Sequence, residues 1–90
     1  MAVDSADYNT LTAATDPRAD NALLDCWLIA NRDRQHAPTC GIFDHQQWPE
    51  GAHCRDFFFA SKSIAERVAA LEVNEETNAS DHQPLMLTIA

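Results

Sequence analysis

The residue types best suited to chemistry stand together near the C-terminus, in the run Ser-Asp-His-Gln-Pro at positions 80–84. This polar run directly precedes an apolar, strand-like segment, and loops at the mouth of a strand often carry binding and catalytic residues. The carboxylate of Asp81 is the kind of oxygen ligand that Mg²⁺ prefers, so Asp81 is the candidate metal ligand. The imidazole of His82 is suited to act as a general base, or to donate a hydrogen bond to charge developing on a reacting phosphate.

A third candidate is Asp56, an acidic residue inside the strongly apolar run at 54–60. A carboxylate that accepts a hydrogen bond from one ring nitrogen of a histidine fixes the tautomer and the orientation of the ring. We therefore expect Asp56 to orient His82, which makes Asp56, Asp81 and His82 the candidate catalytic group. A structural interpretation stays open beside this one: Asp81 caps a turn and His82 is an ordinary surface histidine, since Asp-His pairs are common in loops.

Four strands are expected to position these residues, at 39–43, 54–60, 68–73 and 85–89. The runs at 54–60 and 85–89 are apolar on both faces, and the first is therefore expected to be central in a sheet. Pro84 stands at the beginning of the last strand, where a strand tolerates proline. Asp56 and His82 would then come together because the strands that carry them pair.

Short helices are expected in the remaining apolar runs. Asp4 or Ser5 can cap a helix that carries Tyr8 and ends before the Asp-Pro pair at 16–17. Leucines and a tryptophan at helical spacing predict a second helix over 22–30. Ser61 can cap a third helix of one or two turns that runs through residue 67. About four strands with two or three short helices make the expected fold class α+β.

Composition indicates a folded chain with no general affinity for polyanions. Of the 90 residues, 46% are hydrophobic and only two are glycine, which is typical of a packed globular chain and not of a disordered one. Six basic against 14 acidic residues give a net charge of −8, which argues against sequence-independent binding to nucleic acid or anionic membranes. A phosphate ligand would therefore need a metal ion or a local basic patch.

The cysteines and the hydropathy pattern point to a soluble chain in the cytoplasm. Cys26, Cys40 and Cys54 are odd in number and cannot complete a disulfide framework, which favours a reducing compartment. No apolar run approaches the roughly 20 residues that span a bilayer. The N-terminus also lacks the basic and apolar regions of a signal peptide, so we expect no membrane association.

The order of these motifs resembles the C-terminal half of the endonuclease/exonuclease/phosphatase family, which includes deoxyribonuclease I and apurinic endonucleases. In that family the aspartate of an R-(I/L)-D-Y-(I/F) strand orients the histidine of a terminal S-D-H-x-P motif. Asp56 and His82 stand at these two positions, and Asp81 stands at that of the metal- and water-associated aspartate.

Upstream segments extend the resemblance over most of the chain. Residues 24–27 (Leu-Asp-Cys-Trp) are similar to the family's L-x-D-x-W helix, and residues 39–41 (Thr-Cys-Gly) are similar to its T-x-G/W strand. The run at 80–84 is the most specific part. The family's metal-binding glutamate, its early asparagine and its G-D-x-N motif have no counterpart here, as though the chain begins just after them.

The resemblance implies a hydrolase that cleaves phosphate esters with Mg²⁺ or Mn²⁺, either a nuclease or another phosphodiesterase or phosphatase. Residues 1–90 would form the C-terminal portion of one four-layered α/β sandwich whose N-terminal half is absent. We then expect the ion to be weakly bound or absent, with Asp81 its ligand, and the isolated chain to be inactive. Expected partners are a phosphate-ester substrate, the missing half, and a second copy in a homo-oligomer or a domain-swapped assembly.

Several alternatives remain open. The chain could be a non-catalytic interaction domain that keeps only the family's scaffold. Its cysteines and histidines could hold zinc, although no pair has the close spacing typical of such sites. Trp48, Phe43 and Pro49 could form a wall beside a substrate or could simply pack. Arg32 and Arg34 could meet a phosphate or stay solvated on the surface.

Overall fold

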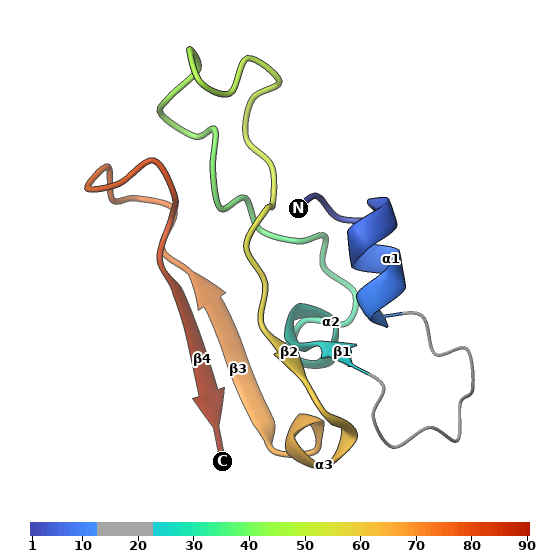
Figure 1. Cartoon of the computed structure of the whole chain (residues 1–90). Coiled ribbons are helices and arrows are strands. Elements are labelled where there is room, and N and C mark those ends of the chain that lie inside the picture. The colour runs from blue at the N-terminus through green and yellow to red at the C-terminus, as the bar shows by residue number, and fades with distance from the viewer. Residues whose placement is uncertain (13–22) are drawn as a thin grey trace.

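The fold combines short helices with two small antiparallel sheets and is described by a computed structural model for residues 1–12 and 23–90 (Figure 1). In chain order the elements are α1 (Ala6–Thr12), β1 (Leu24–Asp25), α2 (Cys26–Ala30), β2 (Phe59–Ala60), α3 (Lys62–Ala65), β3 (Val68–Val73) and β4 (Leu85–Ile89). Strand β1 pairs with β2, and β3 pairs with β4. The α+β class expected from the sequence is confirmed.

Helix α1 begins where the sequence predicts. The hydroxyl of Ser5 accepts a hydrogen bond from the backbone N–H of Tyr8 at 3.2 Å, which satisfies one of the free donors of the first turn. Tyr8 is buried on the inner side of this helix. The expected stop before the Asp-Pro pair at 16–17 lies outside the described residues.

The helix expected over 22–30 is shorter, because residues before Cys26 are used for pairing. Leu24 and Asp25 form β1, opposite Ala60 and Phe59. Asp25 is then the N-cap of α2, and its Oδ1 accepts from the backbone N–H of Trp27 at 2.9 Å. Residue 22 lies outside the described residues.

Strands β3 and β4 form a hairpin with the bounds that the sequence predicts. Val73 pairs with Leu85, Leu71 with Leu87 and Val68 with Ile89, with an irregularity in register near Val68. Leu85 and Leu87 pack against the core, whereas Met86 and Thr88 on the other face are exposed. That outer face carries one apolar and one polar side chain, so the expectation of two apolar faces is only partly met.

The two other expected strands are mostly absent. Of 54–60, only Phe59–Ala60 is a strand, and within the described chain it pairs with β1 and is not central in a larger sheet. The backbone N–H groups of Arg55 and Asp56 donate to the Thr39 hydroxyl and not to a neighbouring strand. At 39–43 the described backbone makes isolated bridges at Cys40 alone.

Gly41 explains why the run at 39–43 does not continue as a strand. Its φ of 77° turns the chain directly after Cys40. A Cβ placed on Gly41 would lie 2.1 Å from the carbonyl oxygen of Gly51, so the two segments approach closely only because this residue is glycine.

Helix α3 is also shorter than expected, ending at Ala65 and not at residue 67. Ser61 occupies the N-cap position, but among the described residues its hydroxyl lies 3.3 Å from that of Ser63 and makes no capping bond. The helix leads directly into β3. It therefore serves as the corner between the two small sheets.

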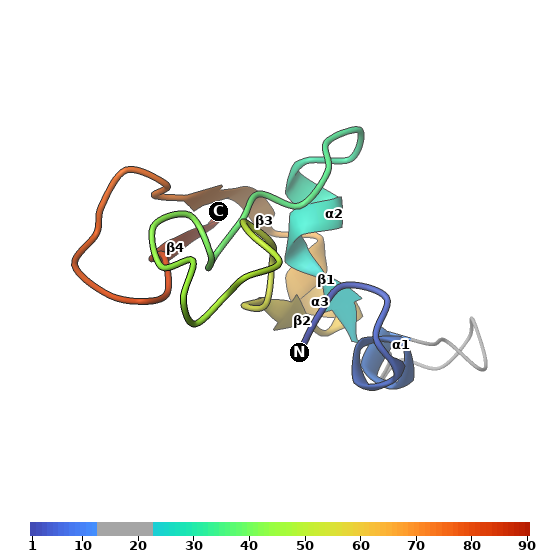
Figure 2. The same cartoon turned by 90° about the horizontal axis from the view of Figure 1, so that it is seen from above.

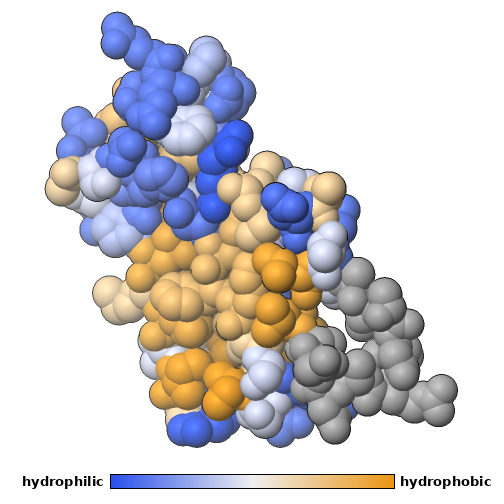
Figure 3. All heavy atoms as spheres, viewed as in Figure 1, coloured by the Kyte–Doolittle hydropathy of each residue, from blue (hydrophilic) through white to orange (hydrophobic). Residues whose placement is uncertain are grey.

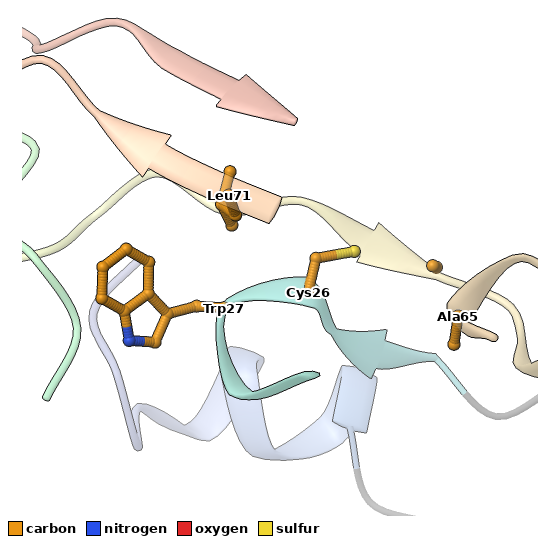
Figure 4. Packing of buried hydrophobic residues seen from close by; sticks show 5 residues of the cluster. Cys26, Trp27, Ala65 and Leu71 are labelled. Atoms are coloured by element: carbon orange, nitrogen blue, oxygen red, sulfur yellow. The ribbon is translucent and has the colours of Figure 1, made fainter. Parts of the chain in front are cut away.

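The hydrophobic core lies between α2 and the β3–β4 hairpin. Cys26 and Trp27 on α2 face Leu71 on β3, and Ala60 and Ala65 complete the buried cluster (Figure 4). Viewed from above, α1 and the loop between β3 and β4 lie on opposite sides of the molecule (Figure 2). The core is small, and the long loops that carry the candidate site extend beyond it (Figure 1).

Candidate functional site

The side chains of Asp56 and His82 meet as the sequence predicts. The Nδ1 of His82 lies 2.7 Å from Oδ2 of Asp56, although 26 positions separate the two residues in the chain. An ionised carboxylate only accepts, so Nδ1 carries the proton and donates it. In the neutral ring Nε2 is then an acceptor. The side chains are 41% and 36% exposed, so a molecule from solvent can approach this pair.

Thr39, which is 1% exposed, brings the two segments of the pair together. Its hydroxyl accepts from the backbone N–H of Arg55 at 2.9 Å and of Asp56 at 3.2 Å. Its carbonyl oxygen accepts from the backbone N–H of Gln83 at 2.6 Å. One buried residue thus fixes the backbone on each side of the Asp56–His82 bond. The pair forms through this bridge and not through the strand pairing expected from the sequence.

Gln83 holds the loop that precedes β4. It is buried, and its Nε2 donates to the carbonyl oxygens of Asn74 at 2.9 Å and Thr77 at 2.8 Å. Both amide hydrogens are thereby used within the loop. No role was predicted for Thr39 or Gln83 from the sequence. The available signal for Gln83 was its position in the polar run that ends at Pro84, before β4.

Asp81 lies beside the pair in sequence but is exposed, and its Oδ1 accepts from the hydroxyl of Ser80 at 3.3 Å. Within residues 1–12 and 23–90 no group of three or more His, Cys, Asp or Glu side chains is placed to hold a metal ion. One oxygen of Asp56 is already engaged by His82. These residues do not make a complete Mg²⁺ site on their own, since that ion requires several converging oxygens.

Trp48 packs against the pair. Its ring lies 6.0 Å from the His82 ring at 87°, and 5.3 Å from the His53 ring at 71°. Of the three residues considered for a wall, Trp48 therefore touches the candidate site, whereas Phe43 and Pro49 are exposed. Arg34 packs instead over the ring of Trp27.

His53 is held as a neutral imidazole. Its Nδ1 donates to the carbonyl oxygen of Gly51 at 2.6 Å, and its Nε2 accepts from Nε of Arg55 at 2.7 Å. A carboxylate oxygen of Glu50 lies 3.6 Å from the same Nε2, which is too long for a hydrogen bond and faces a nitrogen without a proton. His53 therefore positions Arg55.

The three cysteines are buried free thiols. Burial raises the pKa of the Cys54 thiol to about 11, and it also raises the pKa values of Cys26 and Cys40. The sulfur of Cys40 lies 3.4 Å from Nε2 of His53, but Cys40 is fully buried. A protonated, inaccessible thiol is not a nucleophile, so this contact is structural.

A second carboxylate–imidazole pair, not predicted from the sequence, lies beside α1. Oδ2 of Asp25 accepts from the Tyr8 hydroxyl and lies 2.6 Å from Nε2 of His36. Oδ1 caps α2 through the N–H of Trp27, so three donors surround one carboxylate. The pKa of Tyr8 is raised, first by burial and then by its bond to Asp25. Three residues so far apart in sequence gave no local signal.

Comparison with known families, curated proteins and solved structures finds no match for this chain. The similarity of the run at 80–84 to a terminal S-D-H-x-P motif therefore stays a prediction. Within the described residues, no helix is long and apolar enough to cross a membrane. Any assignment of function depends on the geometry of the site.

Proposed function

We propose that residues 1–90 form the C-terminal part of a Mg²⁺-dependent phosphoesterase of the endonuclease/exonuclease/phosphatase type. The observation that carries this proposal is the 2.7 Å bond between Asp56 and His82, which joins the two motif positions from distant segments. The exposure of both side chains supports a role toward a molecule from solvent. The backbone of Asp56 is also fixed by the buried Thr39, which supports a defined position for the carboxylate beside His82.

His82 would act as the proton acceptor for the attacking water. As the oxygen of water attacks phosphorus, a proton moves to Nε2, and the leaving oxygen departs with the bonding electrons. Asp56 keeps Nδ1 protonated and stabilises the imidazolium that forms. Proton transfer by such a positioned group typically contributes about 10²–10⁴-fold in rate.

The metal would be held mainly by residues outside this chain, with Asp81 as one ligand. When bound, the ion would neutralise charge on the phosphoryl oxygens. In a chain of net charge −8, that neutralisation requires a metal ion or a local basic patch. The isolated chain is therefore proposed to be inactive, with Mg²⁺ or Mn²⁺ bound weakly or not at all.

An apolar face supports the proposal that another polypeptide covers this chain. Hydrophobic residues gather over the middle of the face shown in Figure 3, while hydrophilic residues cover the loop end. Phe58, Ile64, Met86 and Ile89 are among the large hydrophobic residues that are at least 37% exposed, with Met86 and Ile89 on opposite faces of β4. The absent N-terminal half of the same sandwich, or a second copy in a homo-oligomer or swapped dimer, would bury exposed apolar side chains of this kind.

The three free thiols support a reducing compartment, and we propose on that ground that the protein is cytoplasmic.

The second candidate function is a non-catalytic interaction domain, which the exposed apolar side chains favour. The two functions differ in what they require of the Asp56–His82 pair. An interaction domain needs neither side chain for its activity.

The test compares the isolated chain with the full-length parent protein on a panel of phosphodiesters and phosphomonoesters with Mg²⁺. We expect no hydrolysis by the isolated chain and metal-dependent hydrolysis by the parent, abolished by EDTA. His82→Ala in the parent should remove this hydrolysis. The matched control is His45→Ala, because His45 is an exposed loop histidine that contacts the Ile42 carbonyl. Binding of a protein partner without hydrolysis of any substrate in the panel would favour the interaction domain instead.

A further inference from the structure

The indole of Trp48 stands against two imidazoles at once. It meets the His82 ring nearly at a right angle and the His53 ring at 71°, with ring centroids 6.0 and 5.3 Å away. Edge-to-face contacts of this kind are directional and favour one relative orientation of the two rings. The contact therefore restricts how the His82 ring can rotate.

Arg55 holds Trp48 in this place. The guanidinium carbon of Arg55 lies 4.9 Å from the centroid of the indole ring, a cation–π contact. The same guanidinium is fixed by its Nε, which donates to Nε2 of His53 at 2.7 Å. Since the Nδ1 of His53 donates to Gly51, the acceptor at Nε2 is also fixed. Gly51 thus orients His53, His53 orients Arg55, and Arg55 packs over Trp48.

The backbone fixes the two histidines relative to each other. Cys40 forms antiparallel bridges with both His53 and His82, so these residues flank one buried position. Two backbone hydrogen bonds close the loop that carries Trp48. The N–H of Trp48 donates to the carbonyl oxygen of Asp44 at 3.2 Å, and the N–H of Gly51 donates to the carbonyl oxygen of Trp48 at 3.0 Å. The indole is thus presented to both rings by a closed turn.

The indole nitrogen of Trp48 does not contribute a hydrogen bond within the described residues. Its Nε1 is buried and has no hydrogen-bond partner among the described residues. Replacement by phenylalanine would remove no hydrogen bond that these residues make, and it would relieve a buried donor. The ring contacts are what distinguish Trp48 from an ordinary packing residue.

We propose that Trp48, held by Arg55, is a positioning residue that keeps the His82 imidazole turned with Nδ1 toward Asp56 and Nε2 toward solvent. Its meaning for catalysis rests on the proposed function, whereas the orientation itself does not. Without the indole, the ring can rotate so that Nδ1 leaves Asp56, and its proton is then no longer held on Nδ1. Only the orientation with Nδ1 bonded to Asp56 keeps Nε2 as a proton acceptor toward solvent.

The test is nitrogen-15 NMR of the histidine rings in the 90-residue chain, which reports the tautomer of each imidazole without any substrate. In the wild type, we expect His82 to carry its proton on Nδ1. Trp48→Phe should preserve this tautomer, because an aromatic ring remains. Trp48→Ala and Arg55→Met should each increase the Nε2–H form of His82 several-fold, while Phe43→Ala, which alters an exposed aromatic of the same loop, should not.

The His36 signals control for the fold, because His36 is bonded to Asp25, away from both substituted residues, and they reveal a variant that unfolds. If Trp48→Ala unfolds the chain, the comparison of wild type, Trp48→Phe and Arg55→Met decides the question. An unchanged His82 tautomer in a folded Trp48→Ala chain, or in Arg55→Met when Trp48→Ala does not fold, overturns the proposal. A changed tautomer with no effect of His82→Ala on hydrolysis by the parent would keep this proposal and reject the proposed function.

Discussion

Two carboxylate–imidazole pairs of nearly equal length lie in different regions of this chain. The Asp25–His36 contact is 2.6 Å and the Asp56–His82 contact is 2.7 Å. Their exposures differ widely: the side chains of His36 and Asp25 are 11% and 1% exposed, whereas those of His82 and Asp56 are 41% and 36% exposed. The distance between the partners therefore says little about their role.

The surroundings of the two pairs differ in the same direction. Asp25 accepts three hydrogen bonds, and the ring of His36 is enclosed by Tyr8, Trp27 and Phe57. Both carboxylate oxygens of Asp25 are thus engaged by groups that belong to the fold. The exposed pair instead leaves Nε2 of His82 without a partner among the described residues. We interpret the Asp25–His36 pair, whose carboxylate is fully hydrogen-bonded, as structural. The exposed Asp56–His82 pair is the one proposed to take part in catalysis.

The largest expected effect is on activity and separates the two histidines. In the proposed full-length phosphoesterase, His82→Ala should lower turnover by about 10²–10⁴-fold, because the proton acceptor is lost. His36→Ala should lower turnover by no more than its loss of folded protein explains. Turnover per folded molecule is measured by steady-state kinetics with the folded fraction from circular dichroism. Equal losses of turnover per folded molecule in the two variants would contradict the assignment of different roles to His82 and His36.

The second effect is on stability and separates the two aspartates. Asp25→Ala leaves the Tyr8 hydroxyl, the His36 ring and the capped N–H of Trp27 without their acceptor, and it should lower the free energy of unfolding by about 3 kcal/mol or more. Asp56→Ala should cost under about 1 kcal/mol, because its partner is exposed to water. Urea unfolding of both variants measures the difference. A larger loss in Asp56→Ala than in Asp25→Ala contradicts the assignment of roles.

A smaller effect concerns pH and the buried thiols. Burial raises the pKa of Cys54 from 9.0 to about 11 in the folded chain. Because the folded state favours the protonated thiol, its stabilising effect is complete below pH 9 and is lost as the pH rises toward 11. Cys26 and Cys40 shift in the same direction. The free energy of unfolding, measured by urea at pH 8, 9 and 10, should therefore fall with pH.

Cys54→Ala supplies the matched control for that titration. It removes the thiol with the raised pKa of about 11 and should flatten the decline above pH 9. A decline of the same slope in this variant would assign the effect to other groups, such as Tyr8, whose pKa is also raised.

Local patterns predicted the elements that form with near neighbours. The bounds of β3 and β4 were predicted because a hairpin joins consecutive segments whose alternation is visible in the sequence. The strands at 39–43 and 54–60 were not, since Thr39 takes the donors of Arg55 and Asp56 that a ladder would use. Propensity describes a residue and its neighbours, whereas a ladder depends on a distant partner.

The same limit applies to the site. The Asp56–His82 contact was predicted from a motif, and the buried network of Tyr8, Asp25 and His36 was missed because no motif or periodicity joins its members. From the sequence, Thr39 was expected to begin a strand, and Trp48 was expected in a loop as a possible wall beside a substrate. Their contacts depend on how the loops fold back on each other, which no local pattern specifies.

The central claim is that the exposed Asp56–His82 pair takes part in catalysis. Asp56→Asn in the proposed full-length phosphoesterase tests it most directly. Asparagine keeps the size of the side chain but removes the charge that stabilises the imidazolium. Turnover should fall by about 10²-fold or more while the free energy of unfolding stays within about 1 kcal/mol of the wild type. A change in turnover under about threefold, well below what a positioned proton acceptor contributes, would contradict the account.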